Sequence, residues 1–328
     1  MKNILLTGAG FSRNWGGWLA NEMFEFLLGC PEVMQSERLR QLLWRHQREA
    51  NGFESALGEL TVVNIFKGSQ QTLTDLRGMQ QAVASAFEHM NSRFWEQPFE
   101  NMERPMTSFL AKFDALFTLN QDLLLDYHYN PALVFPADGK KWRGVQLPGM
   151  RQIPAMAPLQ PDACPNIAYV EDNPLCMDVE ADMQPVYKLH GSYGWSAAAQ
   201  DSMLIMGDNK AHDIEGSNVL SEYFERFIQV LKQQDTRLMV IGYSFRDDHI
   251  NQVIIDAVIH HGLRFFVVDP IGSALAKPET VPPQSLHKTT LIDAFETGLI
   301  GASRRSLAEI FASDAVEYAK LMRFFSRV

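Results

Sequence analysis

Two glycine-containing turns in this sequence could bind a phosphate group. The first is Gly8-Ala9-Gly10-Phe11-Ser12, and the second begins at Gly242 and includes Ser244. Glycine lets the backbone turn tightly and approach a pyrophosphate, and a helix that follows supplies free N–H groups. Ser12 and Ser244 would add hydroxyl groups. A plain turn from strand to helix remains the alternative for both segments, because the usual dinucleotide fingerprint, G-x-G-x-x-G, has a third glycine where this chain has Arg13.

Two polar residues, Asn120 and Asp122, directly follow the apolar run 115–119. An asparagine there can orient a sugar hydroxyl or a water molecule without ionising. An aspartate can supply negative charge to a cationic reaction centre. Asp122 could instead cap the helix that follows, which is a common role for aspartate.

His190 stands in the sequence KLHGS, at the end of another apolar run. A histidine in a cleft can accept a proton near neutral pH, whereas many histidines are structural and simply hydrogen-bonded. Asp269 ends the run FFVVD, where a carboxylate can accept hydrogen bonds from ribose hydroxyls. A solvated turn residue is the alternative for Asp269. In the second glycine turn we expect Asp247 or Asp248 to cap the helix that follows, and capping and packing alone are the alternative for that turn.

Short apolar runs alternate with helical patterns along much of the chain. The predicted strands are 3–7, 115–119, 185–195 with its end at His190, and 263–270, which Asp269 closes. Residues 217–234 predict an amphipathic helix, and 236–262 predict a strand, a turn and a helix. This alternation predicts an α/β fold with a doubly wound parallel sheet of the Rossmann-like type. In such sheets ligands bind beyond the carboxyl ends of the strands, which is where all the candidate residues fall.

We expect a single domain over 1–328, with interruptions between parts of its core. The core is expected in 1–30, 105–130 and 185–275. Residues 31–104 have helical periodicity and predict a helical insertion, 131–184 are rich in proline and predict an irregular loop or lid, and 290–328 predict a helical tail.

Composition excludes several classes of protein. The net charge of −10 argues against a general nucleic-acid binder, which needs a basic face. Three cysteines without a C-x-x-C pair fit a reducing cytoplasm and argue against a disulfide framework or a cysteine zinc site. With no targeting segment or membrane span in the sequence, we expect a cytoplasmic protein without a metal centre.

Five phrases in this order, TGAGFS, TLNQD, KLHGS, VIGYSFRDDHIN and a strand ending in Asp269, resemble the sirtuin superfamily. Within it the chain is similar to the sirtuin-like NAD hydrolases of bacterial anti-phage defence systems. The resemblance covers 1–30, 110–130 and 185–275. It implies catalytic roles for Asn120, Asp122 and His190. It implies NAD contacts for Gly8, Ala9, Gly10, Phe11, Ser12, Gly191, Ser192, Gly242, Ser244, Phe245 and Asp269.

Two departures from protein deacylases favour NAD cleavage. The segment GFSRNWGG lacks the Pro-Asp-Phe-Arg end of the deacylase loop, and three cysteines cannot build the zinc module with its two C-x-x-C pairs. The resemblance therefore implies an NAD+ hydrolase that depletes cellular NAD in abortive infection, with NAD+ as substrate. Control would come from homo-oligomerisation or from a partner such as a HerA-like ATPase or an Argonaute-type protein. A deacylase or ADP-ribosyltransferase, and a non-catalytic scaffold that binds NAD or ADP-ribose, are the alternatives.

Overall fold

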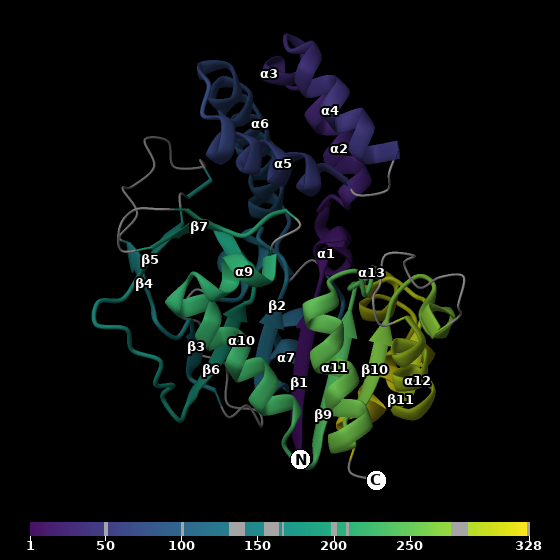
Figure 1. The fold of residues 1–328 in the computed structure, drawn as a ribbon. Coiled ribbons are helices and arrows are strands. Elements are labelled where there is room, and N and C mark those ends of the chain that lie inside the picture. The colour runs from purple at the N-terminus through teal and green to yellow at the C-terminus, as the bar shows by residue number, and fades with distance from the viewer. Residues whose placement is uncertain are drawn as a thin grey trace.

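A parallel sheet forms the centre of the molecule (Figure 1). The computed structural model describes residues 1–48, 52–99, 102–130, 142–153, 164–165, 167–197, 202–207, 210–276 and 288–326. In these ranges the strands of the sheet are β1 (Lys2–Thr7), β2 (Ala115–Thr118), β3 (Gly144–Gln146), β6 (Met183–Lys188), β9 (Thr236–Ile241), β10 (Arg264–Val268) and β11 (Leu299–Ser303). Their order is β11-β10-β9-β1-β2-β6-β3, and each neighbouring pair runs parallel.

The sheet is doubly wound, as the alternation of strands and helices predicts. From β1 the chain passes to β2 and β6 on one side, then crosses back to β9, β10 and β11 on the other. The reversal falls between β1 and β9, so the carboxyl ends of these two strands mark the topological switch point, where such sheets bind ligands. Ile4, Leu5 and Leu6 of β1 are completely buried, as expected of a central strand covered on both faces.

Helices cover both faces of the sheet. On one face lie α10 (Asn218–Leu231), α11 (Asp248–His261) and α12 (Lys288–Gly298). There Phe227 of α10 packs on Phe117 of β2, with ring centroids 5.0 Å apart. On the other face lie α7 (Met106–Leu110), α13 (Leu307–Phe311), α14 (Ala315–Met322) and the short 3-10 helix η4 (Arg323–Phe325), where Phe109 packs on Phe311 at 5.0 Å.

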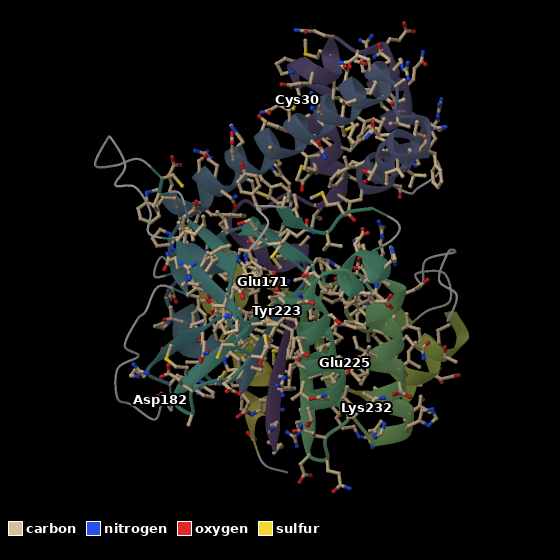
Figure 2. The ribbon with its side chains drawn as sticks, turned by 60° about the vertical axis from the view of Figure 1, so that its left-hand side comes forward. Cys30, Glu171, Asp182, Tyr223, Glu225 and Lys232 are labelled. Atoms are coloured by element: carbon tan, nitrogen blue, oxygen red, sulfur yellow. The ribbon has the colours of Figure 1, made fainter. Side chains whose placement is uncertain are left out.

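A helical module stands beyond the carboxyl ends of the strands (Figure 1). It consists of α2 (Ala20–Leu28), α3 (Pro31–Met34), α4 (Glu37–Arg48), α5 (Gly52–Lys67) and α6 (Gln70–Glu96). Since α2 contacts α4, α5 and α6, the module starts before the predicted insertion at residue 31. Cys30 is a free thiol inside it, far from the interior residue Tyr223 of α10 (Figure 2).

The segment predicted as an irregular loop contains regular structure in its described parts. Besides β3, it supplies β4 (Met150–Ile153) and β5 (Ala168–Glu171) to a second sheet of order β4-β5-β7-β8, with β7 (Gly191–Ser196) and β8 (Ser202–Leu204). The predicted loop positions 131–141, 154–163 and 166 lie outside the described residues. The strands β3, β4 and β5 have three or four residues each, and their sequences GVQ, MRQI and AYVE contain no proline. The prolines that favoured a loop therefore lie outside these strands.

The C-terminal tail contains one strand besides its helices. The strand β11 follows α12 directly and pairs with β10 at the edge of the sheet. Its sequence, LIGAS, is short and includes a glycine, so it carries little of the signal that identifies a strand.

Candidate active site

The carboxyl edge of the parallel sheet brings the candidate residues together. Gly8 follows β1, Asn120 lies two residues beyond β2, and His190 lies two residues beyond β6. Gly242 follows β9 and Asp269 follows β10. Segments separated by as many as 261 positions in the sequence thus meet at one edge, because parallel strands end on the same side of the sheet.

The two glycine turns pack directly against each other. The Gly10 N–H donates to the Gly242 carbonyl oxygen at 2.9 Å, and a Cβ atom on Gly10 would lie 2.7 Å from the Gly242 Cα. Gly242 has a φ of +64°, and a Cβ there would lie 2.3 Å from backbone atoms of Gly10 and Phe11. These glycines therefore allow the turns after β1 and β9 to touch, and the Gly10 N–H already has a protein partner.

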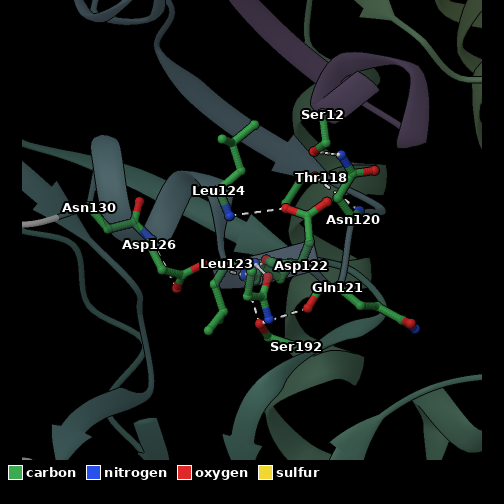
Figure 3. Close-up of polar contacts among 12 residues, drawn as sticks. Ser12, Thr118, Asn120, Gln121, Asp122, Leu123, Leu124, Asp126, Asn130 and Ser192 are labelled. Carbon is green, nitrogen blue, oxygen red and sulfur yellow. Dashed lines mark hydrogen bonds and ion pairs between the residues drawn. The ribbon is translucent and has the colours of Figure 1, made fainter. Parts of the chain in front are cut away.

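Ser12 joins the first turn to the residues that follow β2 (Figure 3). The Asn120 Nδ2 donates to the Ser12 Oγ at 2.8 Å, and the Ser12 hydroxyl lowers the pKa of the nearby Asp122 carboxyl. Below them, the Thr118 Oγ1 accepts hydrogen bonds from the Thr7 hydroxyl at 2.8 Å and from the Asn120 N–H at 3.0 Å. The Ser12 hydroxyl thus orients the side-chain amide of Asn120, and Thr118 holds the backbone N–H of the same residue.

Asp122 is buried and belongs both to this group and to a helix start. Its Oδ1 accepts the N–H of Leu124, the first residue of α8 (Leu124–His128), at 3.1 Å. The N-cap of α8 is Leu123, so Asp122 is not the cap considered for it, although its carboxylate accepts the N–H of the first helical residue. Burial raises the pKa of Asp122 above its usual range, while Lys188 and the hydrogen bonds from Ser12 and Leu124 act in the opposite direction.

His190 is buried and forms a pair with His249 of α11. The two Nε2 atoms are 3.1 Å apart, so one ring donates and the other accepts when both are neutral. Burial is the main cause that lowers the pKa of His190 to about 3, with Lys210 and His249 acting in the same direction against Asp247. Burial therefore keeps His190 neutral at pH 7. Burial also lowers the pKa of His249.

An ion-pair chain connects this histidine pair to the helical module. Lys210, the first residue of α9 (Lys210–Glu215), lies 2.9 Å from Asp247 and 2.7 Å from Glu54 of α5. Asp247 precedes α11, but its carboxylate makes no capping bond to that helix and pairs with Lys210 instead. Burial acts to raise the pKa of Asp247, but Lys210 and the two histidines outweigh it, and the pKa is lowered.

Sequence reasoning missed His249, Lys210 and Glu54. His249 lies one residue inside a helix that starts at the carboxyl edge, so the position rule that identified His190 also applied to it. The other two had no comparable signal, because their place depends on how α5 and α9 dock.

Several predicted NAD-binding residues have buried side chains occupied by protein contacts. Phe11 packs on Trp15 with ring centroids 5.3 Å apart, and Phe245 packs on Phe295 at 5.0 Å. Ser192 is completely buried and donates to the Gln121 carbonyl oxygen at 3.2 Å. These side chains therefore pack inside the protein and stabilise the carboxyl edge of the sheet.

The remaining candidates on the β9 and β10 side are more accessible. Ser244 is exposed, and Asp269 is partly buried with its Oδ1 accepting the Ile271 N–H at 2.9 Å. Burial raises the pKa of Asp269, and this hydrogen bond opposes it. Ala9, the second residue of the first turn, is exposed and begins the short helix α1 (Ala9–Ser12).

A family model for the SIR2-like domain matches residues 114–280, half of the chain. The chain belongs to the SIR2-like family. The matched region of this SIR2-like protein includes Asn120, Asp122, His190 and the turn at Gly242, whereas Gly8–Ser12 precede it. No curated protein matches the chain. SIR2-like domains use NAD+ as substrate, so membership implies an NAD-related activity in general.

The described part of the chain lacks two features that other classes of protein have. Within it, no three His, Cys, Asp or Glu residues come together in a group that could hold a metal ion. No helix there combines the length and the apolar character needed to cross a membrane.

Proposed function

We propose that this SIR2-like protein is an NAD+ glycohydrolase that cleaves the bond between nicotinamide and ribose with water. The observation that carries the proposal is the pairing, at one edge of the sheet, of the Ser12-Asn120-Asp122 group with a buried and neutral His190. The Ser12-Asn120-Asp122 group can orient the ribose and face a developing positive charge. In this proposal His190 accepts a proton.

The reaction breaks one C–N bond and forms one C–O bond. Nicotinamide leaves with the electron pair of the glycosidic bond and becomes neutral, and the ribose carbon becomes oxocarbenium-like, as in glycoside hydrolysis. A water molecule then donates an oxygen lone pair to that carbon and releases one proton. The products are nicotinamide, ADP-ribose and a proton.

In this proposal His190 is the general base. Its low pKa keeps the ring unprotonated at pH 7, and a ring nitrogen takes the proton of the attacking water or of a ribose hydroxyl. His249 accepts or donates across the 3.1 Å contact and so fixes which nitrogen of His190 carries the hydrogen. General-base catalysis of this kind contributes about 10²–10⁴-fold to a rate.

Asn120 and Asp122 act on the ribose in different ways. Because the Asn120 Nδ2 is used by Ser12, its amide oxygen remains as the acceptor for a ribose hydroxyl or the water. As a carboxylate, Asp122 stabilises positive charge on the ribose through space in a buried setting, where electrostatic interactions are stronger than in water.

The phosphates and the adenosine are assigned to the other turns. The first turn and Ser244 face the pyrophosphate in this proposal, and Asp269 accepts hydrogen bonds from the adenosine ribose. Ala9 and Ser244 are exposed, which supports contacts to a ligand.

Hydrolysis is preferred over deacylation on the sequence. The chain lacks the Pro-Asp-Phe-Arg segment, and its three cysteines cannot form two C-x-x-C pairs. An acylated peptide separates the alternatives, because a deacylase would yield O-acyl-ADP-ribose and an ADP-ribosyltransferase would modify the peptide. A non-catalytic scaffold would bind NAD stoichiometrically and return it intact.

We further propose that the activity serves anti-phage defence by depleting NAD and is controlled by assembly. An unregulated NAD hydrolase would harm its own cell. The end of α5 exposes Val62, Ile65 and Phe66, of which Phe66 is 83% exposed, and such an apolar patch supports contact with another chain. The other chain is a second copy or a partner such as a HerA-like ATPase.

The test follows NAD, nicotinamide and ADP-ribose by chromatography, at several protein concentrations and with an acylated peptide in parallel. We expect equal amounts of nicotinamide and ADP-ribose, and loss of both in His190→Ala and Asn120→Ala. Full activity in either variant would contradict the assigned roles. Light scattering at the same concentrations tests control by assembly, and a monomer throughout would contradict it.

A further inference from the structure

A buried lysine, Lys188, lies directly behind the proposed catalytic residues. It is the last residue of β6 and is 1% exposed. Its ammonium group contacts Asp126 Oδ2 at 2.5 Å, the Asp122 carbonyl oxygen at 2.7 Å and the Ser192 Oγ at 2.7 Å. An ammonium has three protons, so each finds one acceptor and the hydrogen-bonding capacity is fully used.

These contacts tie the residues after β2 to β6 and α8. Lys188 holds the Asp122 carbonyl, and Ser192, which Lys188 contacts, donates to the Gln121 carbonyl at 3.2 Å. Asp126, also buried, lies in α8, and its other oxygen accepts from Asn130 at 3.3 Å. The carbonyl groups on both sides of the Asp122 Cα are therefore held, one directly by the ammonium group and the other through Ser192.

The charges around Asp122 are few and asymmetric. Lys188 is the largest influence that lowers the pKa of the Asp122 carboxyl, and Asp126 acts in the opposite direction. The neighbouring elements α1 and α6 contribute the neutral Ser12 to Asp122 and the neutral Asn91 to the adjacent Leu123 N–H at 3.0 Å. Lys188 thus opposes the effect of burial on the pKa of this carboxyl, whereas Asp126 adds to it.

We propose that Lys188 is a positioning residue, which with Asp126 holds the Asn120–Asp122 segment in place for the reaction and places a positive charge beside Asp122. The inference rests on the proposed hydrolase function. Buried ion pairs are costly to desolvate, and apolar residues of similar size often stabilise a fold as well. A role in the site explains why this interior holds a pair of charges.

The proposal predicts opposite effects for the two partners. Lys188→Met leaves Asp122 beside Asp126 without the ammonium, so Asp122 should protonate at higher pH. Asp126→Asn removes the competing negative charge, so Asp122 should protonate at lower pH. A purely structural role would weaken activity in both variants without moving the pH dependence in opposite directions.

Two measurements test this on the full chain. The first is the pH profile of kcat/KM for NAD hydrolysis, where we expect the acidic limb to move up in Lys188→Met and down in Asp126→Asn. Loss of position in Lys188→Met should lower kcat by up to about 100-fold, since a shift of about 1 Å can cost that much. Lys232→Met removes an exposed ion pair with Asp256 at 2.7 Å and should change neither quantity.

The second measurement needs no turnover. The carboxyl of Asp122 is titrated by NMR in protein with ¹³C-labelled aspartate, and its signal is assigned with Asp122→Asn. Opposite shifts in the two variants would support the proposal, and an unchanged Asp122 titration in both would overturn it. If Lys188→Met does not fold, as judged by circular dichroism, Asp126→Asn alone tests the proposal. A lower pKa of the Asp122 carboxyl in that variant would then support the proposal, and an unchanged pKa would overturn it. If wild type binds NAD but does not cleave it, the hydrolase proposal fails, and the NMR titration still decides the role of Lys188.

Discussion

The predicted site residues beyond β2 and β6 have buried polar side chains, whereas Gly242 and Ser244 beyond β9 offer a backbone contact and an exposed hydroxyl. On the first side, Asp122, Lys188 and His190 are at least nine-tenths buried. On the second side, Gly242 packs on Gly10, and Ser244 is exposed. Charged groups that do chemistry need a dry and fixed setting, while a turn that recognises phosphates needs only a particular backbone path. Under the proposed function, this difference divides the edge into a reacting half and a binding half.

The largest expected effect is in the reacting half. His190→Ala removes the proposed general base and should lower kcat by about 10²–10⁴-fold, with NAD affinity changed much less. His260, which is 67% exposed at the end of α11, provides the control, since His260→Ala should be unaffected. Steady-state kinetics at pH 7 measure both. Equal losses in the two variants would remove the distinction between the halves.

In the binding half the largest expected effect is on stability. Gly242→Ala combines a positive φ with overlap of the new Cβ at 2.3 Å from the backbone of Gly10 and Phe11. Gly262→Ala has a similar φ of +72° but nothing within 4 Å, so it reports the backbone strain alone, about 1–2 kcal/mol. We expect Gly242→Ala to cost about 1–3 kcal/mol more than Gly262→Ala in denaturant unfolding. Equal costs would show that the two turns can separate without loss.

The free energy of unfolding should fall at acid pH because His190 is buried in its neutral form. Its pKa is lowered from 6.5 to about 3, so between these values the unfolded chain binds the proton and the folded chain does not. Stability is therefore unaffected above pH 6.5 and falls as the pH drops below it. From pH 7 to pH 5 wild type should lose about 2 kcal/mol more than His190→Gln. Parallel losses in the two proteins would mean that His190 is accessible to protons.

The smallest expected effect belongs to the exposed hydroxyl of the binding half. Ser244→Ala should raise KM for NAD by about fivefold or less and leave kcat unchanged, because one hydrogen bond contributes about 1 kcal/mol. Steady-state kinetics separate the two constants. A fall in kcat with an unchanged KM would place Ser244 in the reacting half instead.

The sequence predicted the residues at the carboxyl edge of the sheet better than the buried residues that hold them in place. Apolar runs end where strands end, so the positions of Asn120, His190 and Asp269 at the carboxyl edge follow from local pattern alone, and the α/β fold was predicted correctly. Lys188 has no such signal, because a lysine at the end of a strand is usually solvated. Its burial depends on Asp126, which is 62 positions away and arrives only when α8 docks.

The same reason explains the differences in the fold. β11 is short and contains glycine, and β4 and β5 lie in a segment rich in proline, so their strand character depends on pairing with neighbours distant in sequence. For the glycines of the first turn, the sequence suggested one reason for glycine and the structure shows another. Their spacing indicated a phosphate loop, and the structure adds a second reason for glycine, the contact with Gly242.

The central claim is that water cleaves NAD at this edge, and hydrolysis in ¹⁸O-labelled water tests it most directly. The wild-type protein is incubated with NAD, and the products are analysed by mass spectrometry. We predict equal amounts of nicotinamide and ADP-ribose, one ¹⁸O atom in each ADP-ribose, and no product with His190→Ala. Recovery of bound NAD intact, or transfer of ADP-ribose to an acyl group or a protein in place of water, would contradict the account.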